Sequence, residues 1–237
     1  FIDHALKGGQ GQFFTPRNVV RMIVEIIDPD AEDFIVDPSC GSGGFLVEAL
    51  RYVWKKIDDE GKKYQWGDDE IKEEKMDFAL NRICGIDKDY FLAKVAKAYM
   101  AILGVNKSGI FCEDSLERPE NWGKQTQMRI GKSKFTALFT NPPFGSKIPV
   151  KGEDKLKQYD LGHKWSLDKK TNEWTKGKLK GKESPQVLFI ERDLELLADY
   201  GKMAIVLPDG VFGNDTFTYI LIKSGSMNKE FNREVVV

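Results

Sequence analysis

Four consecutive residues combine a side-chain amide, two prolines and an aromatic ring: Asn141, Pro142, Pro143 and Phe144. They follow an apolar run over 135–140 that predicts a buried strand, and ligands bind at the carboxyl ends of such strands in α/β sheets. Proline lacks a backbone N–H and has a fixed φ, so the turn is stiff and its prolines offer only carbonyl oxygens. The Asn141 oxygen and a neighbouring carbonyl can accept both hydrogens of one amino group, while Phe144 stacks on the ring that carries it. The motif suits amino-group methylation; a turn that merely closes a loop is the alternative.

A glycine-rich turn lies roughly a hundred residues upstream, after the apolar run 34–36 and before a helical stretch over 47–56. Strand, glycine turn and helix together direct backbone N–H groups at a bound cofactor. The turn reads Asp37-Pro38-Ser39-Cys40-Gly41-Ser42-Gly43-Gly44-Phe45-Leu46. Leu46 stands where a dinucleotide fingerprint needs its third glycine, and the carboxylate of Asp37 suits a cationic group better than a pyrophosphate. We therefore expect a ligand with an ammonium group; a glycine turn without a ligand is the alternative.

Two further predicted strands end in carboxylates: residues 82–86 precede Asp87, and residues 109–112 precede Glu113 and Asp114. An acid at the end of the second strand commonly binds ribose, because one carboxylate can accept hydrogen bonds from both hydroxyls. Asp114 is placed to accept a hydrogen bond from a base amino group. A single aspartate at a strand end is often only a turn residue, but the pattern recurs. Four successive predicted strands end in a polar side chain: Asp37, Asp87, Asp114 and Asn141.

The motifs in this order closely resemble those of the modification (methyltransferase) subunits of type I restriction-modification systems, within the adenine-N6 DNA methyltransferases. The resemblance covers roughly residues 8–215. It rests on five segments: Gln12-Phe13-Phe14-Thr15-Pro16-Arg17, the 37–46 turn, Gly85-Ile86-Asp87, Glu113-Asp114-Ser115 and Asn141-Pro142-Pro143-Phe144. It implies a doubly wound, Rossmann-like α/β sheet that uses S-adenosylmethionine to methylate a flipped adenine in double-stranded DNA.

The resemblance also implies a role for each motif. The first segment would wrap the methionine end of S-adenosylmethionine: Gln12, Phe13, Phe14, Thr15, Pro16 and Arg17. The glycine turn would pass under the cofactor, with Asp37 near its ammonium: Gly41, Ser42, Gly43 and Gly44. Asp87 would bind the ribose hydroxyls, and Asp114 with Ser115 would contact the adenine end. The last motif would be catalytic, with the Asn141 and Pro142 oxygens on the target amino group and Phe144 stacked on the base: Asn141, Pro142, Pro143 and Phe144.

The 237 residues fit one α/β domain, so we expect residues 1–237 to form a single methyltransferase catalytic domain. Within it we expect a cofactor-wrapping N-terminal segment over 1–33 and a lysine-rich insertion over 145–184. The first residue is not Met. Beyond a fifth predicted strand at 202–210, only 234–237 suggests a sixth, whereas the family's sheet has seven strands with an antiparallel final hairpin. We therefore expect a chain truncated at its C-terminus.

The net charge of −1 is small for a protein that binds DNA unaided, because neutralised phosphates supply much of such affinity. Positive charge is local: residues 147–182 hold eleven lysines against five acids, with Tyr159, Trp165 and Trp174 interleaved. This insertion either follows a DNA backbone or is a solvated loop. Another polar segment, 58–75, predicts a surface excursion. No segment is long enough for a target-recognition domain, so we expect a separate specificity subunit; the family also allows a restriction (nuclease) subunit.

The three cysteines form no C-x-x-C pair, and free thiols fit a reducing, cytoplasmic location. The two histidines have no metal-ligand spacing, so no metal is expected. No apolar stretch approaches the roughly twenty residues of a membrane span. Two alternatives stay open: methylation of an RNA base or of a protein glutamine amide, and a non-catalytic scaffold that binds cofactor and a partner. The intact Asn141 and Phe144 argue against the scaffold.

Overall fold

The structure is a computed structural model, and it describes residues 14–145, 148–171, 173–208, 211 and 234–236. Six strands form one sheet in the order β10-β9-β4-β1-β2-β3, and every neighbouring pair is parallel. The strands are β1 (Ile35–Asp37), β2 (Ile83–Asp87), β3 (Gly109–Cys112), β4 (Phe135–Thr140), β9 (Leu197–Ile205) and β10 (Glu234–Val236). The chain runs outward from β1 to β3 and then returns to place β4 beside β1. This reversal creates the switch point at which doubly wound sheets bind ligands, so the predicted fold class is confirmed.

Helices cover both faces of the sheet because successive strand residues point to opposite sides. Ile35 packs into one core and Val36 into the other. The first core holds α1 (Arg17–Ile27), α2 (Gly44–Tyr64) and α4 (Tyr90–Ile102). The second holds α7 (Pro185–Leu196). Short helices η2 (Pro119–Asn121) and α5 (Lys124–Arg129) connect β3 to β4. No helix within the described ranges has an apolar stretch long enough to cross a membrane.

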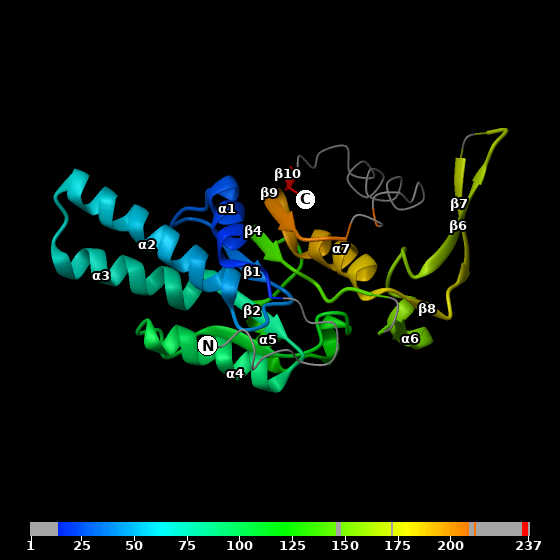
Figure 1. The fold of residues 1–237 in the computed structure, drawn as a ribbon, viewed down its shortest axis with the longest axis horizontal. Helices are drawn as coiled ribbons and strands as arrows, with labels where there is room; N and C mark the ends of the chain where they lie inside the picture. Colours follow the sequence, from blue (N-terminus) through cyan, green and yellow to red (C-terminus); the bar gives the residue numbers. More distant parts are fainter. Residues whose placement is uncertain (1–13, 146–147, 172, 209–210, 212–233, 237) are drawn as a thin grey trace.

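The polar segment 58–75, predicted as a surface excursion, is largely helical. It continues α2 to Tyr64 and then forms most of α3 (Asp68–Asp77), which leads into the π-helix η1 (Phe78–Arg82). Figure 1 shows α2 and α3 side by side at the edge of the molecule. A Cβ on Gly61 would lie 2.6 Å from the Ile71 side chain, so glycine permits this close approach. The Trp54 indole also donates to the Lys75 carbonyl at 2.8 Å.

The lysine-rich insertion has a docked base and a projecting hairpin. Strands β5 (Val150–Lys151) and β8 (Lys182–Glu183) pair at the base, beside α6 (Glu153–Leu156). Leu156 and Tyr159 are buried in the second core. Strands β6 (His163–Asp168) and β7 (Glu173–Leu179) form an antiparallel hairpin that extends away from the sheet (Figure 1). The base is therefore part of the folded domain, whereas the hairpin is mostly exposed.

The predicted strands match the sheet closely, with one difference at β9. This strand begins at Leu197, before the predicted start at 202, and ends at Ile205. Its pairing with β4 shifts register, and Tyr200 has a left-handed φ of 62°. The irregularity lies within a polar stretch that lacks a strand-like sequence pattern. The predicted sixth strand is present as β10.

Candidate active site

A cavity of about 570 Å³ lies at the carboxyl ends of the central strands. Most of the predicted site residues line it: Phe14, Thr15, Arg17, Asp37, Gly41, Ser42, Gly43, Gly44, Asp87, Asp114, Ser115, Asn141, Pro142 and Pro143. Pro16, at the N-cap of α1, and Phe144 are not part of its lining. Gln12 and Phe13 lie outside the described residues. Motifs more than a hundred residues apart in sequence therefore share one concave site.

The glycine turn has the backbone shape that its sequence predicts. Gly43 has a φ of +86° and a Cβ there would lie 3.2 Å from the Ala96 side chain, so this glycine serves turn geometry and packing. Gly41 has a φ of +51°, yet a Cβ at Gly41 or Gly44 would meet no atom within 4 Å. These two positions face open space in the cavity, at the N-terminus of the 21-residue helix α2. The turn can therefore admit a ligand against its backbone, at the N-terminus of a helix.

Asp87 is held by the glycine turn and by its own loop. One oxygen, Oδ2, accepts from the Gly41 N–H at 2.8 Å, and Oδ1 accepts from the Asp89 N–H at 2.8 Å. Burial raises the pKa of Asp87 above its ordinary value, although these two N–H groups act to lower it. A carboxylate has about four acceptor sites, so each oxygen retains one for a ligand. The Asp87 carboxylate is thus held in place at the end of β2, and both of its oxygens can still accept a hydrogen bond from a ligand.

Asp37 is almost fully buried, and its Oδ1 accepts from the Ser39 N–H at 3.0 Å. Burial raises the pKa of Asp37 well above its ordinary value, and the nearby negative charge of Asp87 adds to this. The Ser39 hydroxyl also lies 2.6 Å from the Thr140 hydroxyl, which joins the glycine turn to the end of β4. A cation beside Asp37 would favour its ionised form.

Asp114 and Ser115 lie in the loop after β3. Ser115 donates its hydroxyl to the Pro38 carbonyl at 2.5 Å, so it ties this loop to the glycine turn. Asp114 accepts from the Leu116 N–H at 3.0 Å and pairs with Lys155 at 2.8 Å. Lys155 belongs to the lysine-rich insertion and also lines the cavity.

The motif that ends β4 meets the N-terminal segment. Asn141 donates from Nδ2 to the Thr15 hydroxyl at 2.8 Å, so its carbonyl oxygen is directed away from Thr15. Pro142 and Pro143 follow it along the cavity wall. The first and last motifs of the sequence are thus in direct contact, with the amide oxygen of Asn141 as the acceptor end.

Sequence reasoning missed two groups of lining residues. Lys155 and Val150 come from the insertion, whereas Pro185 and Phe189 come from α7. Proline at the start of an apolar helical pattern would have predicted α7 itself. Nothing in the local sequence indicates that this helix reaches the cavity, because its position depends on packing against β9.

Asp193, one turn after Phe189 on α7, is fully buried. Its carboxyl oxygens form no hydrogen bond with any other described residue. Burial raises the pKa of Asp193 well above its ordinary value, the charge of Asp37 adds to this, and Arg192 opposes it. The folded state therefore keeps a proton that the unfolded state loses as pH rises through its unfolded pKa.

Asp193→Asn should stabilise the protein, and the gain should increase as pH rises above about 4. The amide has the same shape and stays neutral, whereas the acid costs stability between its unfolded and folded pKa. At pH 8 we expect the substitution to raise the free energy of unfolding by at least about 1 kcal/mol, which corresponds to a rise of about 2–4 °C in Tm for a domain of this size. Melting curves at pH 4 and pH 8 would check this; a variant that is less stable at both would contradict it.

Comparisons with known proteins agree with this geometry. The family model described as N-6 DNA Methylase matches residues 3–224. The EcoEI methylase subunit of a type I restriction enzyme from Escherichia coli is 29% identical over 224 residues, covering 92% of this chain and 37% of that protein. The EcoKI methylase subunit from Escherichia coli K12 is 27% identical over 205 residues, covering 86% of this chain and 32% of that protein.

The solved structure of the EcoKI M protein has the same fold. It superposes with a TM-score of 0.58 and 21% identity, covering 89% of this chain and 37% of that chain. A class I S-adenosylmethionine-dependent methyltransferase structure from Listeria monocytogenes shares the fold too. It superposes with a TM-score of 0.55 and 15% identity, covering 89% of this chain and 51% of that chain. The chain thus spans about a third of the lengths of these curated relatives. Since the family model covers nearly all of it, the chain belongs to the N-6 DNA methylase family.

Proposed function

We propose that this chain carries the catalytic centre of a DNA adenine-N6 methyltransferase, as the methylase subunit of a type I restriction-modification system. One observation carries the proposal. Asn141 and Pro142, which suit a planar amino group, line the same cavity as the glycine turn and Asp87. The names of the relatives, methylase subunits of type I restriction enzymes, support the substrate class.

The cavity fits S-adenosylmethionine in three respects. The open space at Gly41 and Gly44 admits a ligand against the backbone. Asp37 is a buried carboxyl that a ligand ammonium would keep ionised, and Asp87 offers one remaining acceptor site on each oxygen. When bound, this cofactor supplies an electrophilic methyl group on a sulfonium.

The residues of this chain would hold the cofactor from end to end. The N-terminal segment, which we place over 1–33, would wrap its methionine end through Thr15 and its neighbours. Asp37 would face the ammonium, Asp87 would bind both ribose hydroxyls, and Asp114 would accept from the adenine amino group. Ser115 would act through the loop that its hydroxyl ties to Pro38.

Asn141 and Pro142 would activate the target. Their two carbonyl oxygens would accept the hydrogens of the adenine N6 amino group, which orients the nitrogen lone pair toward the methyl group. Such acceptors act on the developing charge of the transition state, where fixed polar groups are most effective. No strong base is needed, because the proton can leave to water after transfer.

Adenine N6 inside a duplex is out of reach, so the base must leave the stack at a cost of a few kcal/mol. Phe144 follows the two prolines and would stack on the flipped base. Stacking on an aromatic side chain contributes about 1–3 kcal/mol per base at single-stranded sites, which offsets part of that cost.

The lysine-rich insertion, which we place over 145–184, would contact the DNA backbone. Four exposed lysines of the hairpin region form no ion pair with another described residue: Lys164, Lys169, Lys170 and Lys178. A two-stranded ribbon also has the dimensions to enter a major groove. With a net charge of −1, we infer weak, sequence-independent binding by this chain and sequence choice by a separate specificity subunit.

Replacing Lys169 and Lys170 by glutamine should weaken DNA binding and make it less dependent on salt. Each phosphate contact contributes about 0.9 to the slope of log K against log salt concentration, so the slope should fall by about 2. Anisotropy titrations on random duplexes at several salt concentrations would measure it. Lys62→Gln with Lys63→Gln, at the far end of α2 (Figure 1), changes the charge equally and should leave the slope unchanged.

Calorimetric titration with S-adenosylhomocysteine tests the cofactor assignment directly. We expect binding at one site per chain. A folded chain that binds neither this ligand nor S-adenosylmethionine would refute the proposed function, and tight, sequence-selective DNA binding by the chain alone would refute the need for a specificity subunit.

A further inference from the structure

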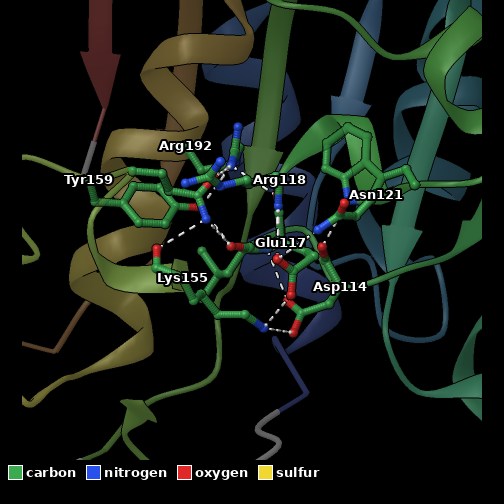
Figure 2. A network of polar contacts seen from close by, with 10 residues as sticks. Asp114, Glu117, Arg118, Asn121, Lys155, Tyr159 and Arg192 are labelled. Carbon is green, nitrogen blue, oxygen red and sulfur yellow. Dashed lines mark hydrogen bonds and ion pairs between the residues drawn. The ribbon is translucent and has the colours of Figure 1, made fainter. Parts of the chain in front are cut away.

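Lys155 joins the insertion to the loop that we assign to the cofactor's adenine. Its ammonium lies 2.8 Å from Oδ2 of Asp114 and 3.2 Å from Oε2 of Glu117. Figure 2 shows the lysine between these two acids. The lysine lies on α6, some forty residues further along the chain than either acid. Lys155 is therefore shared between two carboxylates, of which one is a proposed cofactor ligand.

The loop does not depend on Lys155 for its position. The Tyr159 hydroxyl donates to the Leu116 carbonyl at 3.1 Å, and the Gln158 amide donates to the same oxygen at 3.0 Å. Buried Arg192 donates to the Glu117 carbonyl at 3.1 Å and to the Tyr159 hydroxyl at 2.9 Å (Figure 2). These bonds fix the loop backbone, so the Lys155 ammonium can move without releasing it.

The two carboxylates differ in the hydrogen-bond partners of their oxygens. Asp114 uses Oδ1 for the Leu116 N–H and Oδ2 for Lys155, so a ligand amino group at Oδ2 would have to share that oxygen with the ammonium. Glu117 uses Oε1 for the Arg118 N–H at 3.2 Å and the Asn121 amide at 3.3 Å, and presents Oε2 to Lys155. Burial alone would lower the pKa of Lys155, but Asp114 and Glu117 together raise it overall, which keeps the ammonium charged between them.

We propose that Lys155 is a positioning residue that competes with the adenine amino group for Asp114 and moves onto Glu117 when the cofactor binds. This rests on the proposed function, in which Asp114 accepts from that amino group. Glu117 would hold the displaced lysine and keep the base of the insertion attached. Cofactor binding would thereby alter one attachment of the segment that we assign to DNA contact.

The exchange predicts opposite effects from two substitutions that both remove the Lys155–Glu117 ion pair. Lys155→Met frees Asp114 and should tighten S-adenosylhomocysteine binding by roughly 3- to 10-fold, the scale of one polar contact. Glu117→Gln leaves Lys155 with Asp114 alone and should weaken binding by a similar factor. A lysine that served only to support the loop would instead weaken binding when removed.

Calorimetry on the full chain would measure both dissociation constants, with melting curves to confirm folding. Lys157→Met is the matched control, because Lys157 lies two residues away and pairs with exposed Asp154. Its affinity should match wild type, and Lys155→Arg should restore wild-type affinity. In an Asp114→Asn background the gain from Lys155→Met should disappear.

Weaker or unchanged binding by Lys155→Met, while wild type binds the ligand, would overturn the exchange and leave the proposed function standing. Unchanged binding by Glu117→Gln would do the same. A wild-type chain that does not bind the ligand would overturn both.

Discussion

Asn141→Ala is expected to slow methyl transfer to DNA by roughly 30- to 1,000-fold at saturating cofactor. The substitution removes an acceptor used in the transition state, and loss of one such preorganised group costs about 2–4 kcal/mol. Binding of S-adenosylhomocysteine should change little, since Asn141 is assigned to the target amino group. Incorporation of tritiated methyl groups would measure the rate, and calorimetry the affinity.

Thr15→Val distinguishes a direct role of Asn141 in methyl transfer from a role through its hydrogen bond to Thr15. The Asn141 amide donates to the Thr15 hydroxyl, so an indirect role would appear equally when that hydroxyl is removed. We expect Thr15→Val to retain most of the turnover at saturating cofactor. Wild-type turnover in Asn141→Ala, or an equal loss in both variants, would contradict the assignment of Asn141 to the target.

Asp87→Ala should have the largest effect on cofactor affinity. The carboxylate is fixed by the Gly41 and Asp89 N–H groups, and each oxygen keeps an acceptor site for a ribose hydroxyl. Hydrogen bonds to a charged group contribute about 1.5–3 kcal/mol, so the dissociation constant for S-adenosylhomocysteine should rise by roughly 10- to 150-fold.

Asp89→Ala is the matched control for this change. Asp89 caps α4 by accepting from the Phe91 and Leu92 N–H groups, so its loss should cost about 1 kcal/mol of stability without a comparable loss of affinity. Unchanged affinity in Asp87→Ala would move the ribose contact to another residue.

The sequence predicts the sheet and most of its ligand edge because those features are local. Short apolar runs that end in a polar residue are readable at Asp37, Asp87 and Asn141, and strands in a parallel sheet bring their ends to one edge. Glycine at 43 is readable too, since it alone adopts this φ easily. The parallel order of the strands then follows from the crossover helices.

What the sequence does not reveal depends on contacts between distant segments. The bond between Asn141 and Thr15 spans 126 positions, and that between Lys155 and Asp114 spans 41. No spacing rule predicts either bond, because loop packing determines them. The α2–α3 pair was missed for another reason: α3 has no buried residue and therefore no apolar stripe to indicate a helix. The start of β9 was not predicted because the strand is irregular at Tyr200, whose φ is left-handed.

The most direct test of the proposed function identifies the atom that receives the methyl group. The chain is incubated with methyl-labelled S-adenosylmethionine and unmethylated duplex DNA, alone and with co-purified partner subunits, beside RNA and protein samples. The DNA is then digested to nucleosides and the labelled product identified by mass spectrometry. We expect label in N6-methyldeoxyadenosine, at a defined site when the specificity subunit is present. Label in RNA or on a glutamine amide, or cofactor binding with no transfer to any substrate, would contradict it.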